Sequence, residues 1–228
     1  MYLININPEN PQENKIDEAV RILSKGGVII YPTDTVYALG CDIHNHKAIE
    51  KLCRIKGVKV EKTNLSFICH DLSHISEYCK QLENATFKVM KKALPGPFTF
   101  ILKASSKVPK ILQAKKKTVG IRVPNNEIVR QIVEKLGNPI ITTSLKDDDD
   151  VIEYTTDPEL IFEKYEKQVD LVIDGGYGHN VASTVIDCTN DEFEIIREGL
   201  GDIHPVSYTH LRAHETDSYL VCRLLLEK

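Results

Sequence analysis

The apolar residues of the chain form two kinds of run, which predict helices alternating with buried strands. Apolar residues recur at helical spacing over 16–23, before Gly26 and Gly27, so this segment is predicted to be a helix that ends at the glycines. Residues 28–30 follow directly as an unbroken β-branched run without polar alternation, which is typical of a strand buried on both faces of an α/β sheet. Similar patterns predict helices at 48–56, 73–81, 85–93, from Asn125 to Leu136 and from Asp157 onward, and strands at 65–69, 98–103, 118–123, 140–143, 171–173, 183–187 and 194–196.

This alternation continues without a linker, repeat or change of composition before residue 203. It predicts one α/β domain with a twisted mixed sheet and flanking helices. Asp71, Asn84 and Asn125 precede three of the predicted helices and are expected to cap them.

Residues 206–228 break the pattern and are expected to be foreign to the domain. They resemble a translated sequencing-library adapter, although Leu220, Leu224 and Leu225 also fit an amphipathic helix. We therefore expect the domain to span residues 1–205 and leave 206–228 out of functional reasoning.

Composition limits the class of protein. The 228 residues are 42% hydrophobic and 27% charged, with a net charge of −4, which suits a globular domain. Six cysteines show neither a C-x-x-C motif nor zinc-finger spacing, and a reducing cytosol fits them best. No signal peptide and no run of roughly 18 apolar residues is present, so a soluble, cytoplasmic protein without membrane partners is expected.

The most informative segment for function is the turn after the strand at 28–30. Pro32 fixes the backbone, and Thr33, Asp34 and Thr35 place three polar side chains just beyond the strand. Ligands of α/β sheets bind beyond the carboxyl ends of strands, so this turn is a candidate binding site. An ordinary proline turn explains the same residues about equally well.

Other hydroxyl and cationic residues lie near the ends of predicted strands. Common nucleotide and metal motifs are missing, but clustered cations would suit a polyphosphate or a carboxylate. These residues are Lys56, Lys59, Lys62, Thr99, Arg122, Thr142, Thr143, Ser144, Ser183, Thr184 and Arg197.

Each has a structural alternative. Lys59 and Lys62 fit solvated charges at a helix end, and Thr99 and Thr184 fit ordinary strand residues. Tyr37 fits an aromatic that fills the core, and the acidic run 147–150 fits a solvated loop better than a metal site.

Five ordered motifs resemble the YrdC-like family, whose best-known members are threonylcarbamoyl-adenylate synthases, and within it the YciO branch. The likeness covers about residues 15–205. It rests on the segments 31–40, 94–102, 119–124, 183–187 and 196–202.

The resemblance implies a YrdC-like fold with a basic concave cavity that binds ATP and L-threonine. It implies formation of threonylcarbamoyl-AMP and pyrophosphate from ATP, L-threonine and bicarbonate for tRNA modification, with Mg²⁺ arriving on the ATP and no metal site of its own. By motif, the catalytic residues would be Lys56, Arg122 and Ser144. Substrate would contact Thr33, Thr35, Tyr37, Lys62, Ser183 and Thr184, and the nucleotide would contact Lys56, Thr99, Thr142, Ser144 and Arg197.

The chain departs from the synthase pattern at three places. Val58 stands where the pattern has an arginine, Lys146 where it has an asparagine, and the match of Lys62 is ambiguous with Thr63. A YciO-like protein that binds nucleotide, tRNA or double-stranded RNA with weak or no synthase activity is therefore the alternative. Transfer of another carbamoyl or acyl group is a third. Downstream tRNA-modification proteins are the expected protein partners.

Overall fold

The structure is a computed structural model that describes residues 2–59, 65–73, 75–80, 82–112, 117–145, 153–190 and 192–203. The predictions made for Lys62, Lys146, residues 147–150 and the tail 206–228 lie outside these described residues.

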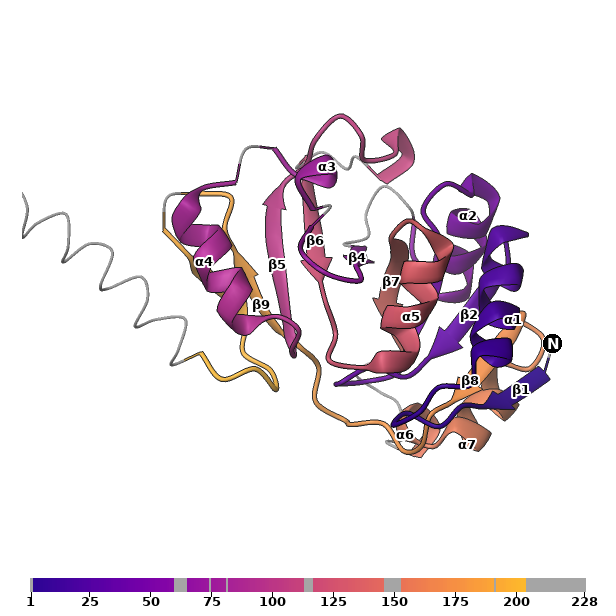
Figure 1. The fold of residues 1–228 in the computed structure, drawn as a ribbon. Coiled ribbons are helices and arrows are strands. Elements are labelled where there is room, and N and C mark those ends of the chain that lie inside the picture. The colour runs from indigo at the N-terminus through magenta and orange to yellow at the C-terminus, as the bar shows by residue number, and fades with distance from the viewer. Residues whose placement is uncertain are drawn as a thin grey trace, which may run out of the picture.

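A ten-stranded mixed sheet with the order β1-β8-β2-β3-β7-β4-β6-β5-β9-β10 runs through the described part of the molecule (Figure 1). Residues that are distant in the chain are neighbours in it, since β2 pairs with β8 and β5 with β9. The strands are β1 (Tyr2–Asn5), β2 (Val28–Tyr31), β3 (Ala38–Asp42), β4 (Ser66–Ile68), β5 (Phe98–Lys103), β6 (Thr118–Arg122), β7 (Ile140–Ser144), β8 (Leu171–Asp174), β9 (Thr184–Asp187) and β10 (Glu194–Arg197).

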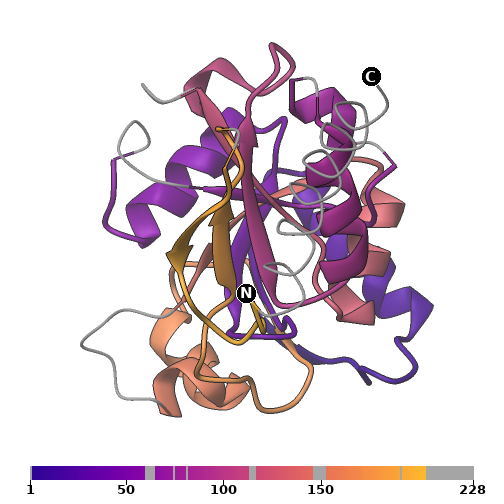
Figure 2. The same cartoon turned by 90° about the vertical axis from the view of Figure 1, so that its left-hand side faces the viewer.

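Two apolar clusters pack on opposite faces of the sheet, because strand side chains alternate between faces. The side of Ile29 and Tyr31 is covered by α1 (Glu13–Ser24) and α5 (Glu127–Leu136). The side of Val28 and Ile30 is covered by α2 (His46–Ile55), α4 (Asn84–Ala93) and α7 (Pro158–Tyr165). Figure 2, seen from the side of β9 and β10, shows α2 on one side of the central strands and α1 and α5 on the other. Short helices α3 (Ile75–Tyr78), η2 (Lys110–Leu112) and α6 (Glu153–Thr156) complete the elements.

The predicted α/β class and most strand positions are confirmed, but two strands were missed. β3 returns antiparallel to β2 immediately after the Pro32 turn, and β1 pairs in parallel with β8. The predicted helix 73–81 is also wrong in extent, since the described helix covers Ile75–Tyr78. Both missed strands depend on partners that local periodicity does not show.

Two capping predictions, those for Asn125 and Asn84, need correction. Asn126, not Asn125, caps α5 by accepting from the Val129 amide. Asn84 is the first residue of α4, after Glu83, which makes no capping bond. The carboxylate of Asp71 accepts from the amide and from the hydroxyl of Ser73.

Candidate functional site at the Pro32 turn

On the face of the sheet that carries Ile29 and Tyr31, hydroxyl and cationic side chains gather on β4, β5, β6 and β7. The register pairs Gly40 with Thr142, Thr142 with Ser66, Ser66 with Gly120, and Gly120 with Ile101, so these residues share a face. Thr99 and Arg122 each lie two residues along their strand from this row, and therefore face the same way. This is also the face of Tyr31, which α1 and α5 cover. The sheet therefore gathers the predicted polar residues beside those two helices.

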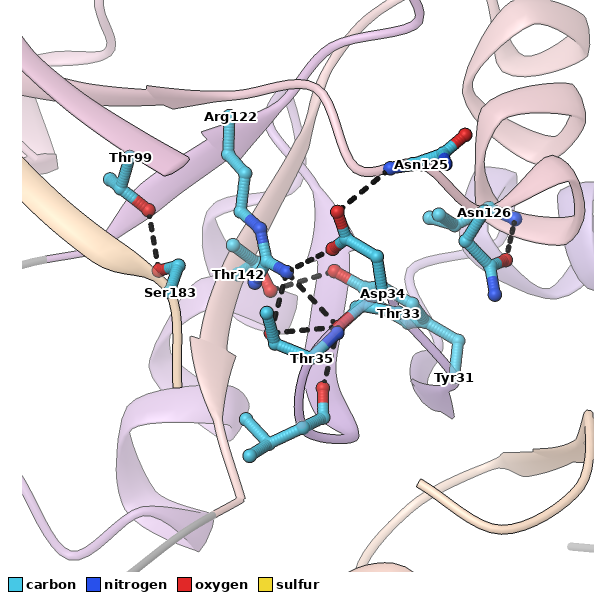
Figure 3. A network of polar contacts seen from close by, with 12 residues as sticks. Tyr31, Thr33, Asp34, Thr35, Thr99, Arg122, Asn125, Asn126, Thr142 and Ser183 are labelled. Carbon is cyan, nitrogen blue, oxygen red and sulfur yellow. Dashed lines mark hydrogen bonds and ion pairs between the residues drawn. The ribbon is translucent and has the colours of Figure 1, made fainter. Parts of the chain in front are cut away.

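The guanidinium of Arg122 is the centre of a hydrogen-bond network with the turn that follows β2 (Figure 3). Its Nη2 donates to the hydroxyl oxygens of Thr33 and Thr35, at 3.1 and 2.6 Å, and to Oδ1 of Asp34 at 2.6 Å. The turn is preformed, because the Thr33 hydroxyl accepts from the Thr35 amide and donates to the Val36 carbonyl. Arg122 thus binds a turn whose acceptors are already oriented.

Asp34 makes the charged contact with Arg122; the sequence placed it in the candidate turn but assigned it no contact of its own. The two side chains form an ion pair in which Arg122 is 8% and Asp34 10% exposed. The second carboxylate oxygen of Asp34 accepts from the Asn125 amide at 3.0 Å. Its position between Thr33 and Thr35 indicated a place in the polar turn. The sequence did not show its partner, because Arg122 is 88 residues away in the chain.

Arg122 also has an unsatisfied donor. Among the buried side-chain atoms that the structure describes, its Nε has no hydrogen-bond partner. A buried donor of this kind can be satisfied by an oxygen atom of a ligand.

A second polar group comes from β5, β9 and β10. The hydroxyls of Thr99 and Ser183 lie 2.9 Å apart, and Arg197 donates from Nε and Nη2 to the Ser183 carbonyl at 3.1 and 2.9 Å. Burial, and then the positive charge of Arg122, lower the pKa of the Arg197 guanidinium. Thr99 lies on β5, next to β6, and faces the same way as Arg122, so the two polar groups lie side by side on one face of the sheet.

Thr142 lies on the same face and binds β2 and β3. Its hydroxyl accepts from the Tyr31 hydroxyl at 2.7 Å and donates to the Leu39 carbonyl at 3.1 Å. Burial raises the pKa of Tyr31, which keeps this hydroxyl a neutral donor. Ser144 ends β7 opposite Ala38, further along the same face.

Tyr37 and Thr184 are not brought into this network. The Tyr37 hydroxyl donates to the Gly176 carbonyl and accepts from the Gly175 amide, in agreement with the structural alternative. Thr184 is fully buried, and its hydroxyl donates to the Gly201 carbonyl and accepts from the Gly199 amide. Both hydroxyls bind the backbone of the scaffold, and the substrate contacts predicted for these two residues stay predictions.

Lys56 lies at the C-terminal end of α2 and is half-buried, and Val58 is 37% exposed. Among the described residues no cluster of three or more His, Cys, Asp or Glu side chains could hold a metal ion. No helix within the same residues is long and apolar enough to span a bilayer.

The model of the Sua5/YciO/YrdC family, described as telomere recombination, matches residues 21–199. The chain belongs to the Sua5/YciO/YrdC family. It is 47% identical over 202 residues to the uncharacterized protein YciO of Escherichia coli, which covers 88% of this chain and 96% of YciO. The crystal structure of that YciO superposes with a TM-score of 0.83, covering 90% of this chain and 98% of that one. The predicted family and the likeness to YciO are thereby confirmed.

A named synthase and a threonine-bound structure share less sequence identity with this chain. The threonylcarbamoyl-AMP synthase of Saccharophagus degradans is 35% identical over 130 residues, which are 57% of this chain and 68% of the synthase. Sua5 of P. abyssi, crystallised with L-threonine, has a TM-score of 0.83 at 26% identity, covering 92% of this chain. The chain spans 61% of that Sua5.

Proposed function

We propose that this protein is a nucleotidyltransferase that forms threonylcarbamoyl-AMP and pyrophosphate from ATP, L-threonine and bicarbonate, for tRNA modification. The observation that carries the proposal is the pair of guanidiniums. Arg122 is held on the Pro32 turn, and Arg197 is held on Ser183, whose hydroxyl lies 2.9 Å from that of Thr99 on the strand beside Arg122. The synthase relatives and the threonine-bound Sua5 support the same reaction.

The proposed chemistry needs such a site. The threonine amine combines with the bicarbonate carbon to give an N-carboxylate, with loss of water. An oxygen of that carboxylate then attacks the α-phosphorus of ATP, and the bond to pyrophosphate breaks. Because an anion attacks an anion, positioned cations and hydrogen-bond donors lower the barrier more than a covalent catalyst would.

We assign the residues by where they lie. Arg122, with Thr33 and Thr35, would hold the amino acid. Arg197, with Thr99, would hold the nucleotide, and Ser183 stays a proposed contact of the amino acid. Mg²⁺ would arrive on the ATP phosphates as part of the substrate. Lys56, Lys62, Thr142 and Ser144 stay proposed contacts on the strength of their motifs.

The alternative is a protein that binds nucleotide, tRNA or double-stranded RNA with weak or no synthase activity. The exposed side chain of Val58 favours it, because an apolar residue stands where the synthase pattern has a cation. The greater similarity to YciO than to the synthase in identity and coverage points the same way.

Pyrophosphate release separates the two candidates. The full-length chain and a version ending at residue 205 are incubated with ATP, Mg²⁺, bicarbonate and L-threonine, and the adenylate is identified by mass spectrometry. Synthase activity predicts threonine-dependent release that Arg122→Ala abolishes and that Arg21→Ala, at an exposed position of α1, leaves unchanged. Release no higher than the enzyme-free blank, together with a shift of structured RNA at low salt, would favour the binding protein.

A Val58→Arg variant sharpens the comparison. If the missing guanidinium limits the reaction, this change raises the rate of pyrophosphate release. A rate equal to that of the unaltered chain means that Val58 is not the limiting departure.

A further inference from the structure

Arg122 and Arg197 differ in how their charges are balanced. Arg122 has a buried ion-pair partner in Asp34, at 2.6 Å. The hydrogen bonds described for Arg197 go to the neutral Ser183, and the ion pairs of the described residues include none for it. One part of the site is therefore close to neutral, and the other keeps a positive charge.

We propose that Asp34 is a positioning and specificity residue that reserves the Arg122 part of the site for a zwitterionic α-amino acid and leaves phosphate to Arg197. The inference rests on the proposed function, since it concerns how that same site divides its two substrates.

The contacts fix the orientation of Arg122. Nη2 is engaged by Thr33, Asp34 and Thr35, while Nε is buried without a partner. Asp34 is itself held by the Asn125 amide, so the guanidinium cannot turn to pair Nε without breaking its ion pair. A ligand carboxylate that accepts from Nε would satisfy the remaining buried donor.

The charges select the class of ligand. An α-amino acid has no net charge, and its ammonium group is attracted by the same carboxylate that balances Arg122. A phosphate dianion would meet Asp34 as a like charge in a buried setting, which is a repulsive element against the wrong ligand. Arg197 carries no such carboxylate and accepts a phosphate without this repulsion.

The test measures binding without ATP, by calorimetry on the full-length chain, with L-threonine and inorganic pyrophosphate as probes. In Asp34→Asn we expect L-threonine affinity to fall about tenfold or more, and pyrophosphate affinity to rise several-fold, because the charge of Arg122 is no longer balanced. If Asp34 had only a structural role, Asp34→Asn would lower the affinity for both ligands or for neither.

Asp170→Asn is the matched control. Asp170 also accepts from a backbone amide, that of Val28 at 2.8 Å, and from a cation, Lys51 at 2.6 Å, but it lies at the start of β2 and β8, away from the Pro32 turn. This variant should bind both probes as the unaltered chain does. Loss of both probes in Asp34→Asn, or unchanged L-threonine binding, overturns the inference.

A second measurement needs no variant and applies if Asp34→Asn does not fold. The unaltered chain should bind L-threonine about tenfold or more tightly than 3-hydroxybutanoate, which keeps the carboxylate but lacks the ammonium group. Equal binding of the two overturns the inference. The binding measurement contains no ATP and is independent of the pyrophosphate-release assay. If the chain selects L-threonine but releases no pyrophosphate, this inference holds and the synthase proposal fails. If it releases pyrophosphate at a rate that Asp34→Asn leaves unchanged, the synthase proposal holds and this inference fails.

Discussion

The buried pair of Arg122 and Asp34 should be strongly coupled in stability. Arg122→Met leaves the Asp34 carboxylate 10% exposed with one remaining donor, the Asn125 amide. Breaking a buried ion pair in this way costs about 3–5 kcal/mol of the free energy of unfolding. Asp34→Asn leaves Arg122 with the Thr33 and Thr35 hydroxyls, so we expect a cost near the lower end of that range.

The double variant Arg122→Met/Asp34→Asn removes both charges. Since no unpaired charge then stays buried, its cost should be about 2–3 kcal/mol less than the sum of the two single costs. The measurement is equilibrium urea unfolding at neutral pH and 25 °C, followed by circular dichroism, for the parent chain and the three variants.

The control is the same cycle at Lys51 and Asp170. That pair has the same 2.6 Å separation, but its side chains are 35% and 42% exposed, so solvent screening should hold the coupling below about 1 kcal/mol. A coupling at Arg122 and Asp34 no larger than at Lys51 and Asp170 would refute the argument that burial makes the first pair strong.

Three further predictions concern the scaffold. Thr184→Val should cost about 1–3 kcal/mol and speed amide exchange around Gly201, because two buried backbone groups lose their partner; equal exchange rates would contradict this. Tyr37→Phe should cost less, about 0.5–1.5 kcal/mol, because the carbonyl that loses its partner belongs to Gly176, which is exposed to water, and a urea midpoint equal to that of the parent would show that the hydroxyl contributes little. Burial raises the pKa of the Cys69 thiol from 9.0 to about 12, so the unfolded chain loses this proton at lower pH than the folded chain does. The free energy of unfolding should therefore fall as the pH rises between these values, by up to about 1.4 kcal/mol per pH unit. Cys69→Ala should reduce this slope.

The local pattern of apolar residues was sufficient to predict the strands that are buried on both faces. The run at 28–30 has no polar alternation, and the structure makes it β2, with both neighbouring strands and both helical layers against it. β3 was missed because Gly40 and Asp42 weaken its strand signal, and its stability comes from pairing with β2 on one side and β7 on the other.

The choice between Ser183 and Thr184 could have been made from the sequence. Adjacent residues of a strand point to opposite faces, so only one of the two hydroxyls can lie on the face of Thr99. The structure puts Ser183 there and turns Thr184 toward Gly201. Strand geometry therefore indicated that the two hydroxyls would not lie on the same face once a strand was predicted to begin at this point.

Asp34 could not be assigned in that way, because its role depends on a contact rather than on a period. Thr33 and Asp34 are equally good turn residues in isolation, and the turn's internal hydrogen bonds need only the threonine. The reason for a carboxylate becomes visible when β6 brings a buried guanidinium to the turn, because a lone buried cation is costly and a neighbouring anion offsets that cost. We infer that the same carboxylate limits which ligands Arg122 can bind. The residue that offsets the cost of burying the arginine would then also disfavour phosphate at this part of the site.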